Sequence, residues 1–216
     1  MKKKILAFTI VLLALFRWET QAQIIEESQV KIRSLDHQST VCLNMGLSLV
    51  GGLINVSGGV GENVSSYSIP AFQLTYDHML EEWFSLGAGV SFQRMGIKYN
   101  DYTYFDEEGV LKMEDFTTKI SRFNFGIRPL FHYGNFSKID MYSGLRLGVT
   151  NWTITSNSRN PLYNPENDVN FKSGLVFAPQ LILFGLRGYF TENIGANFEV
   201  AVGAPHFLSF GLSYRM

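Results

Sequence analysis

Histidine is the residue type most often used for metal binding and for acid–base catalysis, and this chain has four of them. They are His37, His78, His132 and His206, and each falls on a different segment of the sequence. No two of them have the spacing of a pair of metal ligands. We therefore expect no metal site and no cofactor.

A serine close to the last histidine is the nearest approach to a nucleophilic site. Acyl hydrolysis by a serine requires a histidine in hydrogen-bond contact and a carboxylate that orients the histidine. His206 and Ser209 stand three residues apart, and side chains at that spacing point to opposite faces of a strand unless a bulge intervenes. The spacing predicts that the chain is not an enzyme.

Two further segments could hold ligands. The run Gly58-Gly59-Val60-Gly61 lacks the Lys-Ser or Lys-Thr pair and the helix pattern of a phosphate-binding loop, so we expect a flexible loop. The acidic stretch from Asp106 to Asp115 could attract cations or a partner, although such stretches are usually just solvated.

A last group of candidate residues consists of charged side chains on segments that otherwise alternate with apolar residues. Because unpaired charges are costly in a confined space of low dielectric constant, opposite charges on a shared inner face should meet and hydrogen-bond. An interior just wide enough for side chains favours a structural network over a path for solutes. We predict a polar network inside a closed sheet, made of Asp77, Arg122, Arg128, Asp140, Arg146, Arg187, Glu199 and Arg215.

The elements that must position these residues are strands, and the last ten residues show the pattern most clearly. Large apolar residues alternate there with small or polar ones, which predicts a strand with one apolar face and one polar face. The same alternation recurs in residues 41–49, 85–93, 122–128, 139–149 and 194–202. Two less regular segments, 66–77 and 173–190, contain Pro70 and Pro179, where we expect a bulge or a frayed strand end. The count comes to about eight strands.

The connections between these strands are of two kinds. Residues 78–82, 133–137 and 191–193 are short turns, whereas residues 52–65, 96–116 and 152–172 are long polar loops, and residues 203–206 form a brief final connection. Short turns that alternate with long polar loops are typical of an outer-membrane barrel, with the turns in the periplasm and the loops outside the cell. We expect the long loops to be mobile.

The N-terminal residues have the three parts of a secretory signal. Three lysines precede the apolar run Ile5–Phe16, and Thr20-Gln21-Ala22 offers small residues at the positions a signal peptidase reads. We expect residues 1–22 to be cleaved. The remaining chain would then carry 14 basic and 18 acidic residues, a balance that predicts no nucleic-acid partner. The single cysteine, Cys42, can form no intramolecular disulfide and is expected to be inert.

The residues on the polar face of the strands indicate whether the outside of the barrel contacts lipid or water. Past the signal no apolar run reaches eighteen residues, so membrane insertion requires a barrel. A soluble ligand-binding barrel has an apolar interior and charges outside. Here the strand charges are few and are mixed with Gly, Ser and Asn, whose small size suits a narrow lumen. We therefore predict an all-β fold, an eight-stranded antiparallel up-and-down transmembrane β-barrel over residues 40–216, after a periplasmic segment over residues 23–39.

Aromatic residues gather at the expected strand ends and support this orientation, because membrane barrels carry aromatic girdles at both interfaces. They are Trp83, Phe84, Tyr133, Phe136, Tyr189 and Phe190 beside the short turns, and Tyr99, Tyr102 and Trp152 beside the long loops.

With these features the chain resembles the small outer-membrane β-barrel proteins of Gram-negative bacteria, the porin-family or outer-membrane β-barrel domain proteins. The resemblance covers Gln38 to Met216 and is most specific at the C-terminus, Phe207–Met216. It implies that this end is an assembly signal for the barrel-insertion machinery, carried by Phe210, Gly211, Leu212, Tyr214 and Met216. The family signal usually ends in Phe or Trp, and Met216 departs from it.

The function expected from this resemblance is a non-enzymatic integral protein of the outer membrane. It would display extracellular loops for surface interaction or act as a minor porin-like protein, surrounded by outer-membrane lipids and monomeric. Two alternatives stay open: a soluble periplasmic ligand-binding barrel, and an outer-membrane lipid hydrolase, since some barrels similar to this one hydrolyse acyl chains with His and Ser two residues apart.

Overall fold

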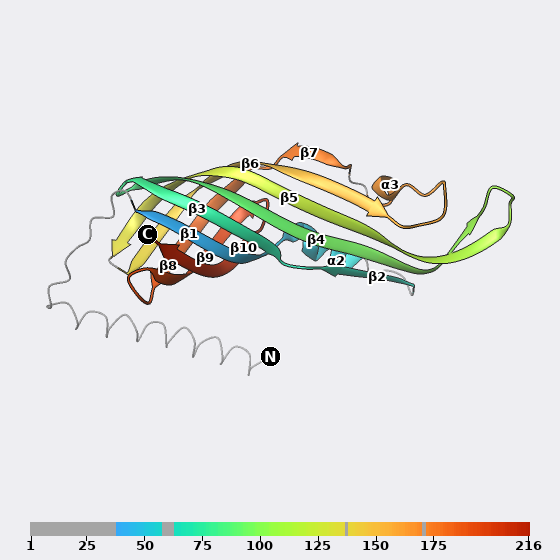
Figure 1. Ribbon diagram of the computed structural model, residues 1–216, viewed down its shortest axis with the longest axis horizontal. Coiled ribbons are helices and arrows are strands. Elements are labelled where there is room, and N and C mark those ends of the chain that lie inside the picture. Colours follow the sequence, from blue (N-terminus) through green and yellow to red (C-terminus); the bar gives the residue numbers. More distant parts are fainter. Residues whose placement is uncertain (1–37, 58–62, 137, 170–171) are drawn as a thin grey trace, which may run out of the picture. The chain divides into compact units, whose positions relative to one another are not determined.

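The computed structural model describes residues 38–57, 63–136, 138–169 and 172–216, which are almost entirely strand (Figure 1). The predicted signal peptide, most of the segment 23–39, His37 and the glycine run 58–61 lie outside the described residues. The elements are β1 (Ser39–Leu47), α2 (Leu49–Ser57), β2 (Val64–Ser68), β3 (Ala71–Glu81), β4 (Phe84–Phe105), β5 (Leu111–Phe136), β6 (Ile139–Ser156), α3 (Pro165–Val169), β7 (Gly174–Phe177), β8 (Gln180–Tyr189), β9 (Ile194–Gly203) and β10 (Leu208–Arg215). No helix in this part of the chain is long and apolar enough to span a membrane.

Eight strands close a ring of antiparallel pairs in the order β1, β3, β4, β5, β6, β8, β9, β10 and back to β1. The ring is closed by β1 and β10, which are paired from Thr40–Arg215 to Leu47–Leu208. Neighbours in the ring are neighbours in sequence apart from this seam, as in an up-and-down barrel. The predicted fold class is confirmed.

Each predicted proline site interrupts a strand. β2 and β3 both pair with β4, and the register shifts by one residue between them, at Ile69 and Pro70. β7 and β8 both pair with β6 on one continuous register, and only Ala178 and Pro179 separate them. Proline has no N–H for the sheet ladder, so each break falls where the ladder can lose a hydrogen bond.

The two faces of the sheet have opposite character. The interior holds buried polar side chains, among them Asp77, Arg128, Arg146 and Glu199, and the exterior exposes large apolar ones such as Leu43 (61%), Phe125 (49%) and Leu212 (62%). Over the middle of the barrel, charged side chains thus point inward and large apolar side chains point outward, which is the arrangement of a barrel in lipid.

One long connection is different from the expected loop. Residues 96–116 continue β4 and β5 as a paired hairpin, which turns only at residues 106–110 (Figure 1). A register shift between Tyr99 and Tyr102, with Asp101 at φ 53°, interrupts the alternation of inward and outward residues. An aspartate tolerates this left-handed conformation, and the extra residue obscures the period of two in the sequence.

Candidate functional site

The centre of the barrel contains a chain of ion pairs contributed by different strands. Arg128 donates to Glu199 (Nη2 to Oε1, 2.5 Å) and to Asp77 (Nε to Oδ1, 3.2 Å). Arg187 donates to the other oxygen of Asp77 and to Asp140 (Nη1 to Oδ2, 3.1 Å). Five of the eight residues proposed for the inner network thus contact one another, and each arginine joins two carboxylates.

Two further side chains, those of Tyr142 and His206, contact this network. The Tyr142 hydroxyl donates to Glu199 at 2.8 Å, and the Arg187 guanidinium lies 4.4 Å from the centre of the Tyr142 ring. His206 Nε2 lies 3.5 Å from the second Glu199 oxygen. Tyr142 and His206 were not in the predicted set. Tyr142 stands on the inward register of its strand, and this periodicity was the signal that could have added it.

The other three predicted members bond to neutral groups. Arg146 donates to Gln73 Oε1 at 2.7 Å and to the Gly89 carbonyl at 2.9 Å, and Arg122 donates to the Pro205 carbonyl. Arg215 is half-buried near the short turns, where it donates to the Glu192 carbonyl and lies 4.0 Å from the centre of the Tyr189 ring. These arginines are held by carbonyl and amide oxygens, acceptors that a pattern of charges cannot reveal.

A serine, a histidine and an aspartate form a hydrogen-bonded row at the turn end of the barrel, the end that carries the short turns. Ser85 Oγ lies 2.8 Å from His132 Nε2, and His132 Nδ1 lies 2.6 Å from Asp140 Oδ1. This is the connectivity of an activated serine. Ser85, however, is completely buried, and Asp140 is shared with Arg187, so the row is an extension of the ion-pair network.

His206 and Ser209 do not lie on opposite faces as expected; both are buried within the barrel. The reason is that β10 begins only at Leu208, so the strand period does not apply to His206. Ser209 is paired in register with Glu199, yet it has no exposed surface through which a substrate could reach it.

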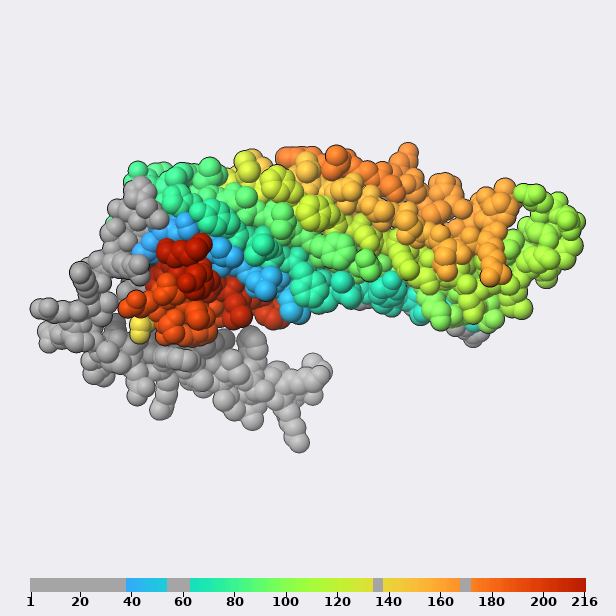
Figure 2. Space-filling view, in the orientation of Figure 1, coloured from blue at the N-terminus to red at the C-terminus, as the bar shows by residue number. Residues whose placement is uncertain are grey.

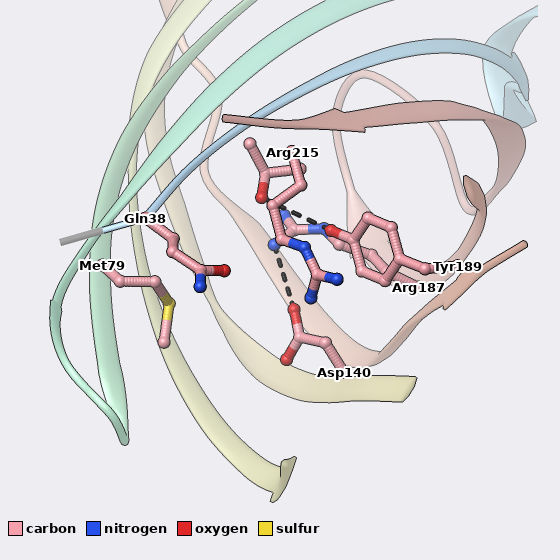
Figure 3. A pocket seen from close by; sticks show the side chains of 7 residues that line it. Gln38, Met79, Asp140, Arg187, Tyr189 and Arg215 are labelled. Carbon is pink, nitrogen blue, oxygen red and sulfur yellow. Dashed lines mark hydrogen bonds and ion pairs between the residues drawn. The ribbon is translucent and has the colours of Figure 1, made fainter. Parts of the chain in front are cut away.

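A small pocket opens at the turn end, beside Asp140 and Arg187 (Figure 3). Its volume is about 20 Å³, room for about one water molecule. The view shows Arg187 joined to Asp140, with the Tyr189 ring and Arg215 beside them. Tyr189, expected in an aromatic girdle, is buried here and lies 3.4 Å from Thr40 Oγ1.

Part of the barrel interior near the loop end, where the long connections lie, is lined by apolar side chains. Met95, Ile120 and Ile154 form a buried cluster inside the barrel, and Val50 from the first turn of α2 packs against it together with Trp152. We call this cluster, which β4, β5 and β6 contribute, the apolar layer; it lies nearer to the outer loops than the ion-pair network does. Trp152 therefore packs inward and is not part of a lipid-facing girdle.

An aromatic cluster continues the packing beyond the apolar layer. Tyr99 stacks on buried Phe116 with ring centres 4.6 Å apart, and Tyr163 from the third long connection contacts the same ring at 4.7 Å. Tyr102 meets Phe116 edge-on at 5.1 Å. Tyr99 and Tyr102 thus join the hairpin to the third loop. Of the girdle residues expected at the turn end, Trp83, Tyr133 and Phe190 are exposed and Phe84 is half-buried, while the side chain of Phe136 lies outside the described part of the chain.

Hydrogen bonds also tie the third loop to the hairpin. The Glu114 carboxylate accepts the Ser158 hydroxyl and the Arg159 backbone N–H (2.8 Å), and Asn157 accepts the Thr117 N–H at 2.7 Å. In the space-filling view the orange third loop lies directly against the yellow-green end of β5 (Figure 2). An open hollow of about 390 Å³ lies between them, lined by Tyr104, Asp106, Glu107, Glu108, Lys112, Arg159 and Pro161. The acidic stretch is thus structured and carries both signs of charge.

The tip of the hairpin depends on one carboxylate. Asp106 Oδ1 accepts the N–H groups of Val110 (2.8 Å) and Glu108 (3.0 Å), and Lys112 lies 3.4 Å from Oδ2. The Val110 N–H is the main cause that lowers the pKa of Asp106 below its usual value. Because the folded pKa is depressed, the turn is stabilised at pH above the ordinary carboxyl pKa of about 4 and is weakened as the pH falls through the lower folded value.

We therefore expect amide hydrogen exchange at Glu108 and Val110 to be slow and independent of pH near neutrality, after correction for the intrinsic rate, and to lose protection in acid. Asp106→Asn should remove this pH dependence, whereas Glu107→Gln should keep it. Equal acid behaviour of both variants would contradict the assignment.

The other predicted residues lie as follows. Phe210, Leu212, Tyr214 and Met216 are exposed on the apolar outer face, Gly211 lies between them, and their role as an assembly signal stays a prediction. Cys42 is buried and free. No group of His, Cys, Asp and Glu suited to a metal ion occurs among the residues that the structure describes.

Comparison with known proteins gave matches only at the level of structure. No family model matches the sequence, and no curated protein matches it. Solved structures similar to it include the N-terminal β-barrel domain of Pseudomonas aeruginosa OprF (12% identity, TM-score 0.44, 84% of this chain and 98% of that one), P. aeruginosa OprG (11%, 0.43, 85% and 99%) and Ail of Yersinia pestis (12%, 0.41, 84% and 99%).

OprG and Ail are described as outer-membrane proteins. The class of fold rests on the closed ring of eight strands, its polar interior and its apolar exterior. The chain has the fold of a small outer-membrane β-barrel, so the resemblance seen in the sequence is confirmed at the level of fold.

Proposed function

We propose that this barrel is a non-conducting protein of the outer membrane of a Gram-negative bacterium that presents the β4–β5 hairpin and the third loop as a surface for interactions outside the cell. One observation carries the proposal. β4 and β5 remain paired as far as Phe105 and Leu111, beyond the last partners that β2 and β6 supply at Val64 and Ser156. A paired hairpin tied to a loop forms a fixed surface, which lowers the entropic cost of binding.

The interior supports this role over that of a porin. Arg128, Arg146, Arg187 and Tyr142 are completely buried, so their side chains occupy the space that a solute path would need. An eight-stranded ring has an interior just wide enough for side chains. Near the loop end, the apolar layer occupies part of the same interior.

The two alternatives receive less support. A soluble ligand-binding barrel would expose few apolar side chains, whereas Leu43, Phe125 and Leu212 are exposed here on the strands themselves. A lipid hydrolase needs an accessible nucleophile, and Ser85 and Ser209 have no exposed surface. Cleavage of the signal, the assembly machinery as partner and the monomeric state remain predictions.

Conductance and surface labelling test the proposal together. The folded chain in a planar bilayer is expected to give no stable current steps, under conditions in which a large porin does.

Cys42 is buried, so an introduced cysteine is the expected site of labelling. Leu111→Cys, on the hairpin, should react with a membrane-impermeant maleimide on intact cells, and Lys138→Cys, at the turn end, should react only after permeabilisation.

A shortened chain, in which Tyr102–Glu114 is replaced by a tight turn, tests the use of the hairpin. It should keep a heat-dependent mobility in SDS electrophoresis, because the barrel ring is untouched, and should lose adherence of the expressing cells to arrays of glycans and matrix proteins. Stable ion currents, or labelling of Lys138→Cys on intact cells, would overturn the proposal.

A further inference from the structure

Three basic side chains gather on the outer face of the barrel near its loop end. Lys119 on β5 is paired with Gly96 on β4, so Arg94 and Lys98 flank it two residues to either side on the neighbouring strand. All three are exposed, and no ion pair joins any of them to a carboxylate of the described ranges. Like charges are rarely placed this close on a sheet without a counter-charge, because their repulsion is unfavourable.

A tyrosine completes this basic cluster. Tyr67 on β2 is paired with Gly96 from the other side, so that Tyr67, Gly96 and Lys119 form one row across three strands. A Cβ at Gly96 would lie 2.5–2.7 Å from the ring carbons and hydroxyl of Tyr67. The absence of a side chain at Gly96 thus allows the phenol to pack against β4 at Gly96, two residues from both Arg94 and Lys98.

The basic cluster lies at the edge of the apolar band. Phe72, Phe92 and Phe123 form a single row by register, and each is exposed (44%, 37% and 50%). Arg94 is the next outward-facing residue beyond Phe92, about 7 Å further along the strand, and its guanidinium lies 5.6 Å from the Phe92 ring centre.

Most outward residues beyond this phenylalanine row are polar, although Ile69, whose N–H donates to the Arg94 carbonyl, is exposed there as well (37%). Arg94 pairs with Ser121, which pairs with Thr153. The boundary between lipid tails and headgroups therefore falls between the phenylalanine row and Arg94 on this side of the barrel.

We propose that the basic cluster binds the phosphate groups of a phosphorylated lipid in the outer leaflet, whose acyl chains lie along the phenylalanine row. Charge complementarity and the continuity with the apolar band both point to a lipid, since a free anion would gain nothing from the phenylalanines. The inference rests on the proposed function for its orientation, because the loop end must face the outer leaflet. Asp115, an exposed acid four residues before Lys119 on β5, accepts the Asp101 N–H at 2.9 Å.

The binding geometry follows from the donors. Lys98 and Lys119 provide ammonium groups, Arg94 provides a planar guanidinium that can bind two phosphate oxygens, and Tyr67 provides a hydroxyl. Their spread along β4 from Arg94 to Lys98 suits a headgroup that carries more than one phosphate.

Native mass spectrometry of the folded chain in an uncharged detergent tests this directly. The probes are a bis-phosphorylated acyl disaccharide, the same glycolipid without phosphate, and inorganic phosphate. The triple variant Arg94→Gln, Lys98→Gln, Lys119→Gln should bind the phosphorylated glycolipid roughly a hundredfold more weakly than the unmodified chain, about fivefold for each charge. Lys138→Gln, Arg159→Gln, Lys172→Gln removes the same charge from exposed sites elsewhere and should bind normally.

The outcomes separate this inference from the proposed function. Equal binding by both triple variants, or equal binding of the phosphate-free glycolipid, would overturn the lipid site while leaving the orientation from maleimide labelling intact. Binding of inorganic phosphate as tight as that of the glycolipid would make the cluster a free-anion site and would also overturn it. If the triple variant does not fold, Lys119→Gln alone should weaken binding about fivefold and serves the same comparison.

Discussion

Replacing Glu199 with glutamine is expected to lower the free energy of unfolding of the barrel by about 1.5–3 kcal/mol, the usual range for hydrogen bonds to charged groups, because Arg128 loses the Glu199 carboxylate and keeps only Asp77 at 3.2 Å. Glu199 accepts hydrogen bonds from Arg128 and from the Tyr142 hydroxyl (2.8 Å). Arg128 is completely buried, so water cannot replace the lost carboxylate. The amide keeps the shape of the side chain, which attributes the loss to charge and not to a cavity.

Denaturant unfolding of the barrel in detergent micelles, followed by tryptophan fluorescence and by the heat-dependent mobility shift, measures this loss. Glu82→Gln, at an exposed turn, is the matched control and should change stability little. Combining Glu199→Gln with Arg128→Gln should cost less than the sum of the two single changes, because the double variant removes both charges of the pair. Additive costs, or a stable Glu199→Gln barrel, would show that the pair is not coupled.

The second large effect is expected at Gly211, where the barrel closes. A Cβ there would lie 2.0 Å from the Leu43 carbonyl oxygen and 2.7 Å from the Asn44 Cα, which are backbone atoms that cannot move aside without opening the β1–β10 seam. Gly211→Ala should therefore destabilise the barrel by about 1–3 kcal/mol. Gly188→Ala is the matched control, because Gly188 also lies on a strand of the ring and a Cβ there would have no other atom within 4 Å.

Unfolding midpoints of the two alanine variants, measured in the same micelles, check this difference. Gly211→Ala should unfold at the lower denaturant concentration, and the fraction that resists unfolding by SDS without heating should fall. Equal midpoints would contradict the close approach at the seam. Gly211 also lies in the predicted assembly signal, so a change there could affect insertion in the cell. Purified, refolded protein is therefore the proper sample, because its unfolding reports the stability of the barrel alone.

The period of two was sufficient to predict the barrel, because each face of a membrane barrel strand has a uniform environment. Where a residue breaks the period, the sequence was less informative. The register shift beside Asp101 conceals the hairpin, so the pattern of residues 96–116 predicts a loop although Tyr102, Tyr104 and Phe105 favour a strand. The interruptions at Pro70 and Pro179, in contrast, were predicted, because proline always lacks the N–H that a strand ladder needs.

The inner site was predicted less completely than the fold. The alternation of residues along each strand predicts that Asp77, Arg128 and Glu199 lie on the inner face. Which of them form ion pairs depends on which strands face each other across the barrel and on how far each side chain extends, and the order of the strands does not specify this. Arg146, for example, extends to Gln73 on the far side of β4 and β5 and makes no ion pair with a described residue. The apolar layer was also missed, because Met95, Ile120 and Ile154 stand at inward positions where a polar residue is the rule.

The apolar layer and the single-water pocket give the two ends of the interior different surfaces. Near the loops, Met95, Ile120 and Ile154 line β4, β5 and β6, whereas the pocket beside Asp140 and Arg187 lies near the short turns. Among the residues that the structure describes, Asp140 and Arg187 are thus the members of the ion-pair network that border a space large enough for water. In the orientation proposed above, a change of salt or pH on the turn side would act on these two residues first, while the contact surface formed by the hairpin lies at the other end of the barrel.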